Sequence, residues 1–264
     1  MGRFAFIRRA AACAAALTIL ASGARPSTAA DVVVFTSAAP AVVEQVLATA
    51  FTETTGNRVL FDVGTVREIQ GKLSDSARPD IVVLPAAALD VVDKASGLRP
   101  GSRIDLARVG IGVVVRAGAT LPDISSVDAL RQTLLAARSI AHPDPLGGGF
   151  AGAQIARMFA RLGIADAIKP KVSLAYAFTG GVAQVANGDA EIGLFNISEI
   201  LPVSGVTLVG PLVPELQSYI TFSAALHAGS AAPEPAAGFL HALSDPHARD
   251  AWLTAGFEPI GGAH

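Results

Sequence analysis

The sequence predicts an α/β fold with two lobes that are joined by two long extended segments. Between residues 32 and 195, short runs rich in Val, Ile and Leu alternate with segments whose apolar residues recur at helical spacing. Strands and helices that alternate in this way indicate a parallel sheet covered on both faces. Two longer extended runs, at residues 109–115 and 219–226, divide the chain into two such blocks. A single doubly wound domain with long edge strands is the alternative to two lobes.

The first block contains three predicted strands, each followed by a predicted helix. The strands are apolar, largely β-branched runs at 32–35, 58–61 and 81–84. The helices have apolar residues three or four positions apart and cover 40–55, 66–73 and 86–95. Gly56 follows the first helix directly and is a typical stop signal, because glycine readily adopts the backbone conformation that ends a helix.

The second block repeats this pattern after a polar stretch that carries Gly118 and Pro122. Its expected helices and strands lie at 127–136, 139–141, 152–162, 172–175, 182–187 and 191–195. After the second extended run, helical segments are expected at 234–243 and 248–255. We therefore assign residues 31–112 and 221–264 to lobe 1, and residues 113–220 to lobe 2. Hinged lobes that close on a ligand are a common switching arrangement.

The N-terminus has the order of a secretory signal. Three arginines and no acids occupy the first nine residues, an uncharged and mostly apolar stretch follows at 10–21, and small residues occupy 27–30. This order predicts a signal peptide over residues 1–30. The apolar stretch is too short for a membrane span, which needs about 20 residues. We expect an exported, periplasmic protein without membrane insertion after cleavage.

Charge and cysteine content exclude several function classes for the predicted mature chain. Residues 31–264 hold 16 basic and 22 acidic residues, which gives a formal charge of −6. A net-negative chain without a basic run has no electrostatic footprint for nucleic acid or an anionic membrane. The single cysteine, Cys13, lies in the predicted signal, so disulfides and thiolate chemistry are not expected. The five histidines are too scattered for a metal cluster, and we expect a monomer without cofactor or metal.

Four strand-to-helix junctions carry Ser, Thr or Gly and are candidate anion sites. They lie at 36–38, 64–66, 147–152 and 179–181. In open α/β sheets ligands bind beyond the carboxyl ends of the strands, where helix N-termini point at them. Taken alone, Ser or Thr at such a junction is more often a helix cap than a ligand contact, and Gly there more often permits a tight turn. Two junctions fall in each predicted lobe, however, so closure would bring all four onto one small anion.

Several segments of the chain together resemble a known family. They are TSAAP, GTVREIQGKL, RPDIVVL, GGGFAGAQIARMFARLG, NGDAEIGLFNISEI and GFEPI. These segments resemble the molybdate-binding periplasmic proteins, which are solute receptors of ABC importers with the type II periplasmic binding protein fold. They also look similar to a divergent branch that includes aconitate isomerase, a secreted enzyme. The resemblance implies a small anionic solute and the membrane permease of an ABC importer as partners.

The resemblance also implies a set of neutral ligand-binding groups. The hydroxyls, backbone amides and tyrosine hydroxyl of the family fall on Ser37, Thr65, Ala151, Gly152, Gly180 and Asn196. The family usually has serine where this chain has Thr65, and tyrosine where it has Asn196. Asparagine offers an acceptor as well as a donor, and a fully deprotonated oxyanion has no use for an acceptor. An organic carboxylate therefore becomes an alternative to molybdate.

Three functions stay open from the sequence. The first is a receptor that delivers an oxyanion or a carboxylate to an ABC importer. The second is an isomerase of an aconitate-like acid, which needs a base that moves a proton next to a carboxylate. His142, at the end of the predicted strand 139–141 and beside the Gly-rich turn, is the best-placed candidate for that base, although such a histidine is more often a surface loop residue without a catalytic role. The third is a sensor or scaffold that regulates a partner.

Overall fold

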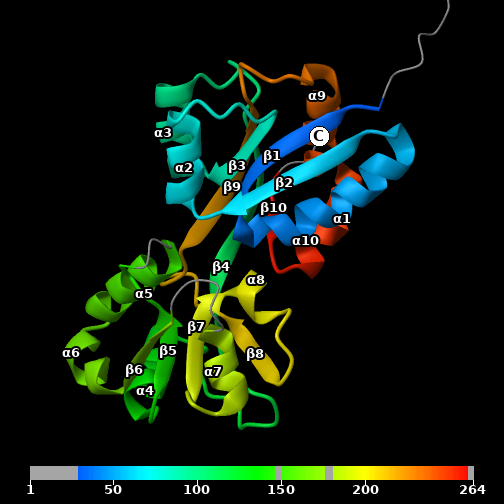
Figure 1. Cartoon of the computed structure of the whole chain (residues 1–264). Helices are drawn as coiled ribbons and strands as arrows, with labels where there is room; N and C mark the ends of the chain where they lie inside the picture. The colour runs from blue at the N-terminus through cyan, green and yellow to red at the C-terminus, as the bar shows by residue number, and fades with distance from the viewer. Residues whose placement is uncertain (1–28, 147–149, 176–180, 261–264) are drawn as a thin grey trace, which may run out of the picture.

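The computed structural model describes residues 29–146, 150–175 and 181–260. Figure 1 shows two lobes, one above the other, connected by strands β4 and β9. The predicted signal lies outside the described residues except for Ala29 and Ala30, and Gly180 lies outside them as well. Every strand and helix predicted above is present, with ends shifted by a few residues. In the described part of the chain, no helix is long and apolar enough to cross a membrane.

Lobe 1 has a sheet with helices on both faces. Its elements are β1 (Asp31–Ser37), α1 (Ala38–Thr55), β2 (Arg58–Gly64), α2 (Val66–Ser74), β3 (Ile81–Pro85), α3 (Ala86–Ser96), α9 (Pro233–Ser244), η2 (Pro246–Ala248), α10 (Arg249–Thr254) and β10 (Glu258–Pro259). One apolar core joins α1, α9 and α10 to the sheet around Trp252 and Phe239. A second core joins α2 and α3 to the opposite face around Ile69 and Leu89. The C-terminal helices thus complete a lobe that the N-terminal residues begin.

Lobe 2 is built in the same way from the middle of the chain. Its elements are α4 (Val127–Ala136), β5 (Ile140–Pro143), α5 (Phe150–Arg161), α6 (Ala165–Ile168), η1 (Lys169–Lys171), β6 (Val172–Ala175), α7 (Gly181–Asn187), β7 (Ile192–Asn196), α8 (Ile197–Ile200) and β8 (Val206–Pro211). Helices α4, α5 and α6 cover one face around Ile155 and Leu134. Helices α7 and α8 cover the other face around Phe195.

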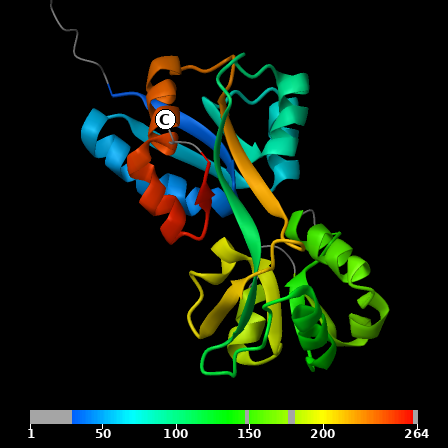
Figure 2. The same ribbon diagram turned by 180° about the vertical axis from the view of Figure 1, so that it is seen from behind.

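Two antiparallel strands, β4 (Ile104–Arg116) and β9 (Tyr219–Leu226), form the hinge and are visible along their length in Figure 2. At the crossing, the Gln217 carboxamide accepts from Ile111 N and donates to Ile111 O, both at 2.9 Å. A Cβ atom on Gly110 would lie 2.8 Å from Gln217 Nε2, so only glycine leaves room for this pair of hydrogen bonds. The exact lobe boundaries, at residues 112/113 and 220/221, stay a prediction.

The strand directions place the candidate junctions opposite one another. Strand β3 is antiparallel to β9, which is antiparallel to β4. Strands β3, β1 and β2 therefore all run with β4, toward lobe 2. Strand β7 is antiparallel to β4, and β5 and β6 are parallel to β7, so these three run toward lobe 1. The carboxyl ends of β1, β2 and β3 thus face those of β5, β6 and β7, and we call these two sets of strand ends the facing edges.

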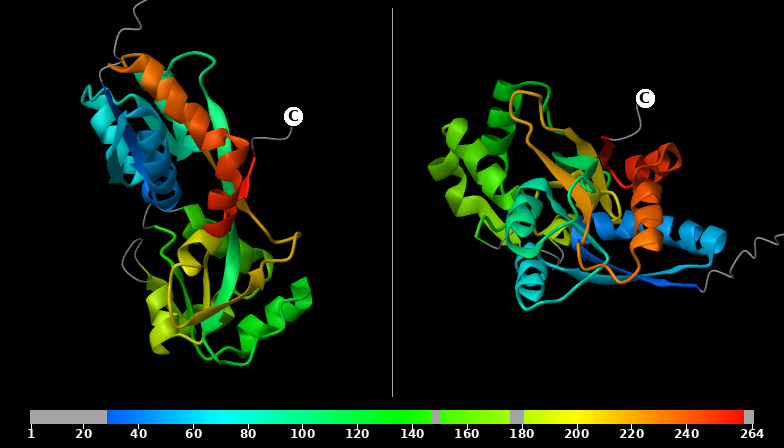
Figure 3. Two further views of the ribbon diagram at one scale, coloured as in Figure 1. Left: turned by 90° about the vertical axis from the view of Figure 1, so that its right-hand side faces the viewer. Right: turned by 90° about the horizontal axis from the view of Figure 1, so that it is seen from above.

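Helix α8 links the lobes directly. It follows β7 in lobe 2, yet Ile197 packs against the core of lobe 1. Gly256, in the turn after α10, has φ +84°, and a Cβ there would lie 2.9 Å from Ile197 Cγ2 and 3.1 Å from Ser198 N. The left view of Figure 3 shows α10 (red) beside α8 (yellow) where the lobes meet. The start of α8 therefore belongs to the boundary between the lobes.

Candidate functional site

The facing edges carry most of the residues that the resemblance selected. Ser37 is the last residue of β1, and Thr65 follows the end of β2. On the other side Asn196 is the last residue of β7, while Ala151 and Gly152 lie in the first turn of α5. Gly180 cannot be placed, because it lies outside the described residues. Residues separated by more than a hundred positions in the chain thus share one region between the lobes.

Ser37 is the lobe 1 residue whose side chain is free to bind. It occupies the N-cap position of α1 with an extended backbone (φ −78°, ψ 155°), but its side chain makes no capping hydrogen bond. Its Oγ is buried and has no hydrogen-bond partner in the described part of the chain. A buried hydroxyl without a partner costs about 1–3 kcal/mol, so such a group is expected where a ligand supplies the missing bond.

Thr65 has a different local role. Its Oγ1 accepts from Glu68 N at 3.2 Å, and Glu68 Oε2 accepts from Thr65 N at 2.7 Å, which is a capping box for α2. The hydrogen bond from Thr65 N, followed by that from the Thr65 hydroxyl, lowers the pKa of Glu68. The spacing Thr-x-x-Glu is the sequence signature of this motif. The Thr65 hydroxyl is therefore already engaged in capping the helix.

Ala151 and Gly152 lie where α5 meets the end of β5. Both residues are buried, and a Cβ on Gly152 would lie 2.5 Å from Pro143 O and 2.7 Å from Asp144 O. Glycine is therefore required for the close approach of α5 to this strand end. The approach brings the first turn of α5, whose backbone N–H groups have no partner within the helix, to the lobe 2 side of the facing edges.

His142 points into the core of lobe 2. Its ring is buried and meets Phe159 edge-on, with 5.3 Å between the ring centroids. Nδ1 lies 2.8 Å from Pro143 O, which assigns the proton of a neutral ring to Nδ1. Burial lowers the pKa of His142, and the hydrogen bond to Pro143 opposes that shift. The sequence predicted His142 at the end of the strand 139–141, beside the Gly-rich turn, and the structure places it inside β5, so a surface loop is not its position. Its catalytic role stays a prediction.

Asn196, at the lobe 2 edge, is hydrogen-bonded to an acidic residue, Glu199. Asn196 is buried, and its Nδ2 donates to Glu199 Oε1 at 2.6 Å, while its Oδ1 is buried and finds no partner in the part of the chain that the structure describes. Glu199 keeps part of its surface exposed, yet the atoms packed around its carboxyl group raise its pKa by desolvation, and the bond from Asn196 opposes this. Glu199 was not predicted from the sequence. The signal that could have found it is an acidic residue three positions after the candidate ligand residue Asn196.

Glu44 is a buried carboxyl group next to the lobe 1 edge, and it too was missed. It lies on α1 and is wholly enclosed, and Thr36, the neighbour of Ser37 in β1, donates from Oγ1 to Glu44 Oε1 at 3.0 Å. Burial raises the pKa of Glu44 to about 8. Its Oε2 has no hydrogen-bond partner among the residues that the structure describes. The carboxyl group is therefore largely neutral at pH 7.

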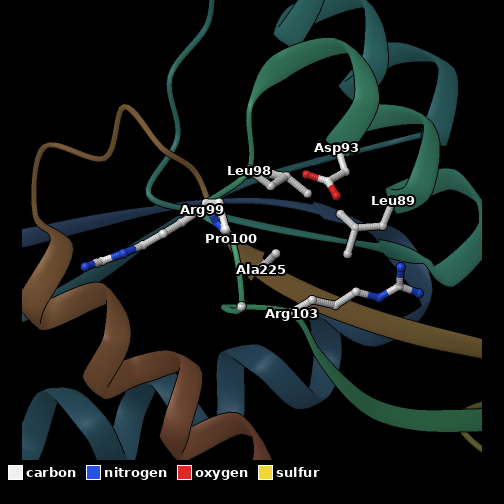
Figure 4. Close-up of a pocket in the computed structure, with 8 residues that line it drawn as sticks. Leu89, Asp93, Leu98, Arg99, Pro100, Arg103 and Ala225 are labelled. Atoms are coloured by element: carbon white, nitrogen blue, oxygen red, sulfur yellow. The ribbon is translucent and has the colours of Figure 1, made fainter.

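A pocket in lobe 1 lies far from the facing edges. It is lined by Leu89, Asp93, Leu98, Arg99, Pro100, Gly101, Arg103 and Ala225. Figure 4 shows these side chains between α3 and the end of β9, which is the end of the strand away from the hinge. Arg103 is paired with Asp90 rather than free for a ligand. Among the described residues, no group of three His, Cys, Asp or Glu side chains could hold a metal ion.

Comparison with known proteins agrees with this architecture. A curated relative, the aconitate isomerase of a Pseudomonas species, is 32% identical over 197 residues, which cover 74% of this chain and 73% of the relative. Among solved structures, a substrate-binding domain assigned to a molybdenum ABC transporter of Clostridium difficile superposes with a TM-score of 0.76 at 16% identity. That match covers 88% of this chain and 100% of the other.

The periplasmic molybdate-binding protein of Azotobacter vinelandii superposes with a TM-score of 0.68 at 21% identity, over 86% of this chain and 98% of that protein. At these identities the structural likeness shows the fold alone. It confirms the type II periplasmic binding protein fold, and the relatives together confirm the family resemblance that the sequence predicted. The family model described as bacterial extracellular solute-binding protein matches residues 32–258. The chain therefore belongs to the bacterial extracellular solute-binding protein family.

Proposed function

We propose that this chain captures a small organic carboxylate between its two lobes, outside the cytoplasm, and delivers it to an ABC importer. One observation carries the proposal: two buried polar atoms have no partner within residues 29–146, 150–175 and 181–260, and they are Ser37 Oγ at the lobe 1 edge and Asn196 Oδ1 at the lobe 2 edge. Native proteins pair nearly all such atoms. A ligand held between the lobes would pair both, and it would thereby favour the closed arrangement.

The chemistry of these groups favours a carboxylate over a metal oxyanion. Ser37 and the free backbone N–H groups of the first turn of α5 are neutral donors, which suit any small anion. Asn196 stands where the molybdate-binding family has tyrosine. Its Nδ2 is engaged with Glu199, so it offers the ligand an acceptor. A deprotonated tetrahedral oxyanion has no hydrogen to give to that acceptor, whereas an organic acid can carry a hydrogen-bond donor on the same molecule as its carboxylate.

Transport is supported by the family and by the predicted export signal at residues 1–30. In this proposal, lobe 1 (31–112 and 221–264) and lobe 2 (113–220) close around the hinge strands. The closed form, as a monomer, would present both lobes to a membrane permease. Ligand-dependent closure gives the permease a way to distinguish loaded from empty receptor.

A second candidate function is isomerisation of an aconitate-like tricarboxylic acid. The 32% identity to an aconitate isomerase favours it. It requires a group that removes a proton next to a carboxylate, and His142 is the base that the sequence proposes. Incubation of residues 31–264 with cis- or trans-aconitate, followed by proton NMR, tests this function. Conversion of one isomer into the other would establish it, and conversion that survives His142→Asn would reject His142 as the base.

A thermal-shift screen of residues 31–264 tests the main proposal. The panel contains citrate, malate, succinate, both aconitates, molybdate, tungstate and sulfate. A ligand present at a hundred times its dissociation constant stabilises the protein by about 2.7 kcal/mol. We expect a carboxylate to raise the melting temperature and the metal oxyanions to leave it unchanged. Stabilisation by molybdate or tungstate alone would contradict the proposal.

A further inference from the structure

The hydrogen bond between Asn196 and Glu199 fixes the direction in which the Asn196 amide points. The two ends of an amide look alike, so its orientation has to follow from its partners. Here Asn196 Nδ2 donates to Glu199 Oε1 at 2.6 Å, and a carboxyl oxygen that carries no proton can only accept a hydrogen bond. The nitrogen end of the amide is therefore the end that faces Glu199, and this bond lowers the pKa of Glu199 against the larger effect of burial, which raises it.

The opposite end of the same amide is an acceptor without a donor. Asn196 Oδ1 is buried and has no partner among the described residues, although Asn196 occupies the N-cap position of α8, where an amide oxygen commonly accepts from the helix. The side chain makes no capping bond there. Residue Asn196 also pairs with Ile111 of the hinge strand, so this acceptor lies beside the hinge at the lobe 2 edge.

The two sides of the site therefore need different hydrogen-bond partners from the ligand. The Ser37 hydroxyl can donate to a negatively charged oxygen, whereas Asn196 Oδ1 can only accept. We propose that the ligand is a hydroxycarboxylate whose hydroxyl group donates to Asn196 Oδ1, and that Glu199 is the positioning residue that sets this preference by fixing the amide. The inference rests on the proposed function, because it names the class of carboxylate that the same site selects.

The preference is measurable with pairs of ligands that differ only in one hydroxyl group. Citrate and tricarballylate form one pair, and malate and succinate form a smaller one. Without the hydroxyl, the buried Asn196 Oδ1 stays unpaired in the complex. We expect the hydroxylated member of at least one pair to bind about tenfold more tightly or better, as measured by isothermal titration calorimetry at constant pH.

The variant Glu199→Gln tests the positioning role. A glutamine side chain offers a donor as well as an acceptor, so it no longer dictates which end of the Asn196 amide faces the ligand. We expect the ratio of the two affinities to fall below about threefold, with the weaker ligand losing little or nothing. A merely structural role would weaken both ligands equally and leave the ratio unchanged. Glu199→Asp, which keeps an acceptor-only group, should retain part of the ratio.

Two further variants complete the experiment. Asp166→Asn removes an exposed acid elsewhere in lobe 2 and should keep the wild-type ratio. Asn196→Ala removes the acceptor itself and should bring the ratio close to one, which tests the inference even if Glu199→Gln does not fold. If wild-type protein binds no carboxylate of the panel, the proposed function and this inference both fail. If it binds carboxylates without preferring the hydroxyl, or if Glu199→Gln keeps the preference, the inference alone fails.

Discussion

The buried carboxyl group of Glu44 should make the stability of this protein depend on pH in an unusual direction. Burial raises the pKa of Glu44 from 4.5 to about 8, against a hydrogen bond from Thr36 that lowers it. The native state therefore holds a proton that the unfolded chain releases near pH 4.5. The stability linked to this proton is fully present below pH 4.5 and is lost as the pH rises toward 8.

The size of the effect follows from the same two pKa values. Between pH 5 and pH 8 the linkage relation gives a loss of about 3 kcal/mol in the free energy of unfolding. For a chain of this size that loss corresponds to about 6–12 °C in melting temperature. Glu44→Gln keeps the shape of the side chain but cannot titrate. Between pH 5 and pH 8, the free energy of unfolding of Glu44→Gln should therefore fall by about 3 kcal/mol less than that of wild type.

Urea unfolding of residues 31–264 at pH 5, 6, 7 and 8 measures the effect. The difference in slope between wild type and Glu44→Gln isolates Glu44 from every other titrating group, and it does not depend on any constant cost of the substitution. Glu53→Gln, on the exposed side of the same helix, is the matched control and should follow wild type. Parallel pH profiles of wild type and Glu44→Gln would refute the reasoning.

Three further substitutions test the hinge, the lobe boundary and the site. Gln217→Ala leaves the backbone N–H and C=O of Ile111 without their side-chain partner and should lower the free energy of unfolding by about 2 kcal/mol in urea titrations. Gly256→Ala should cost more stability than Gly118→Ala, because both glycines have φ near +80° but only Gly256 is packed against α8, so equal melting temperatures would contradict this. Ser37→Ala should weaken carboxylate binding about tenfold in calorimetry and leave the melting temperature of the free protein within a few degrees.

The fold was predictable because its signals are local. Alternation of strand and helix periods sets the order of elements, and Gly56 and Gly256 mark helix ends by their positive φ. Strand β8 was missed because its half-buried residues show no clear pattern; it lies against β4 at the margin of the sheet. Helix α8 was missed because four residues are too few for a helical period to show.

The site was predictable only in part. Family likeness proposed Ser37 and Asn196 as ligand-binding residues, but it gave no sign of the hydrogen bond from Asn196 Nδ2 to Glu199, which leaves Asn196 Oδ1 unpaired among the described residues. The Thr-x-x-Glu spacing at Thr65 could have predicted its role in capping α2. Glu44 offered no such signal, because its enclosure comes from the packing of α1 on the sheet, and packing between distant segments leaves no local trace in the sequence.

Ligand-induced closure of the two lobes is the central claim, and a distance measurement tests it most directly. Residues 31–264 contain no cysteine, so spin labels can be placed at Asp75→Cys in lobe 1 and Arg157→Cys in lobe 2, both at exposed positions. Double electron–electron resonance then gives the distance between the labels. We predict that the distance shortens when the carboxylate found in the thermal-shift screen is added, and that Ser37→Ala shifts this response to higher ligand concentration. A distance that does not change at saturating ligand would contradict the account.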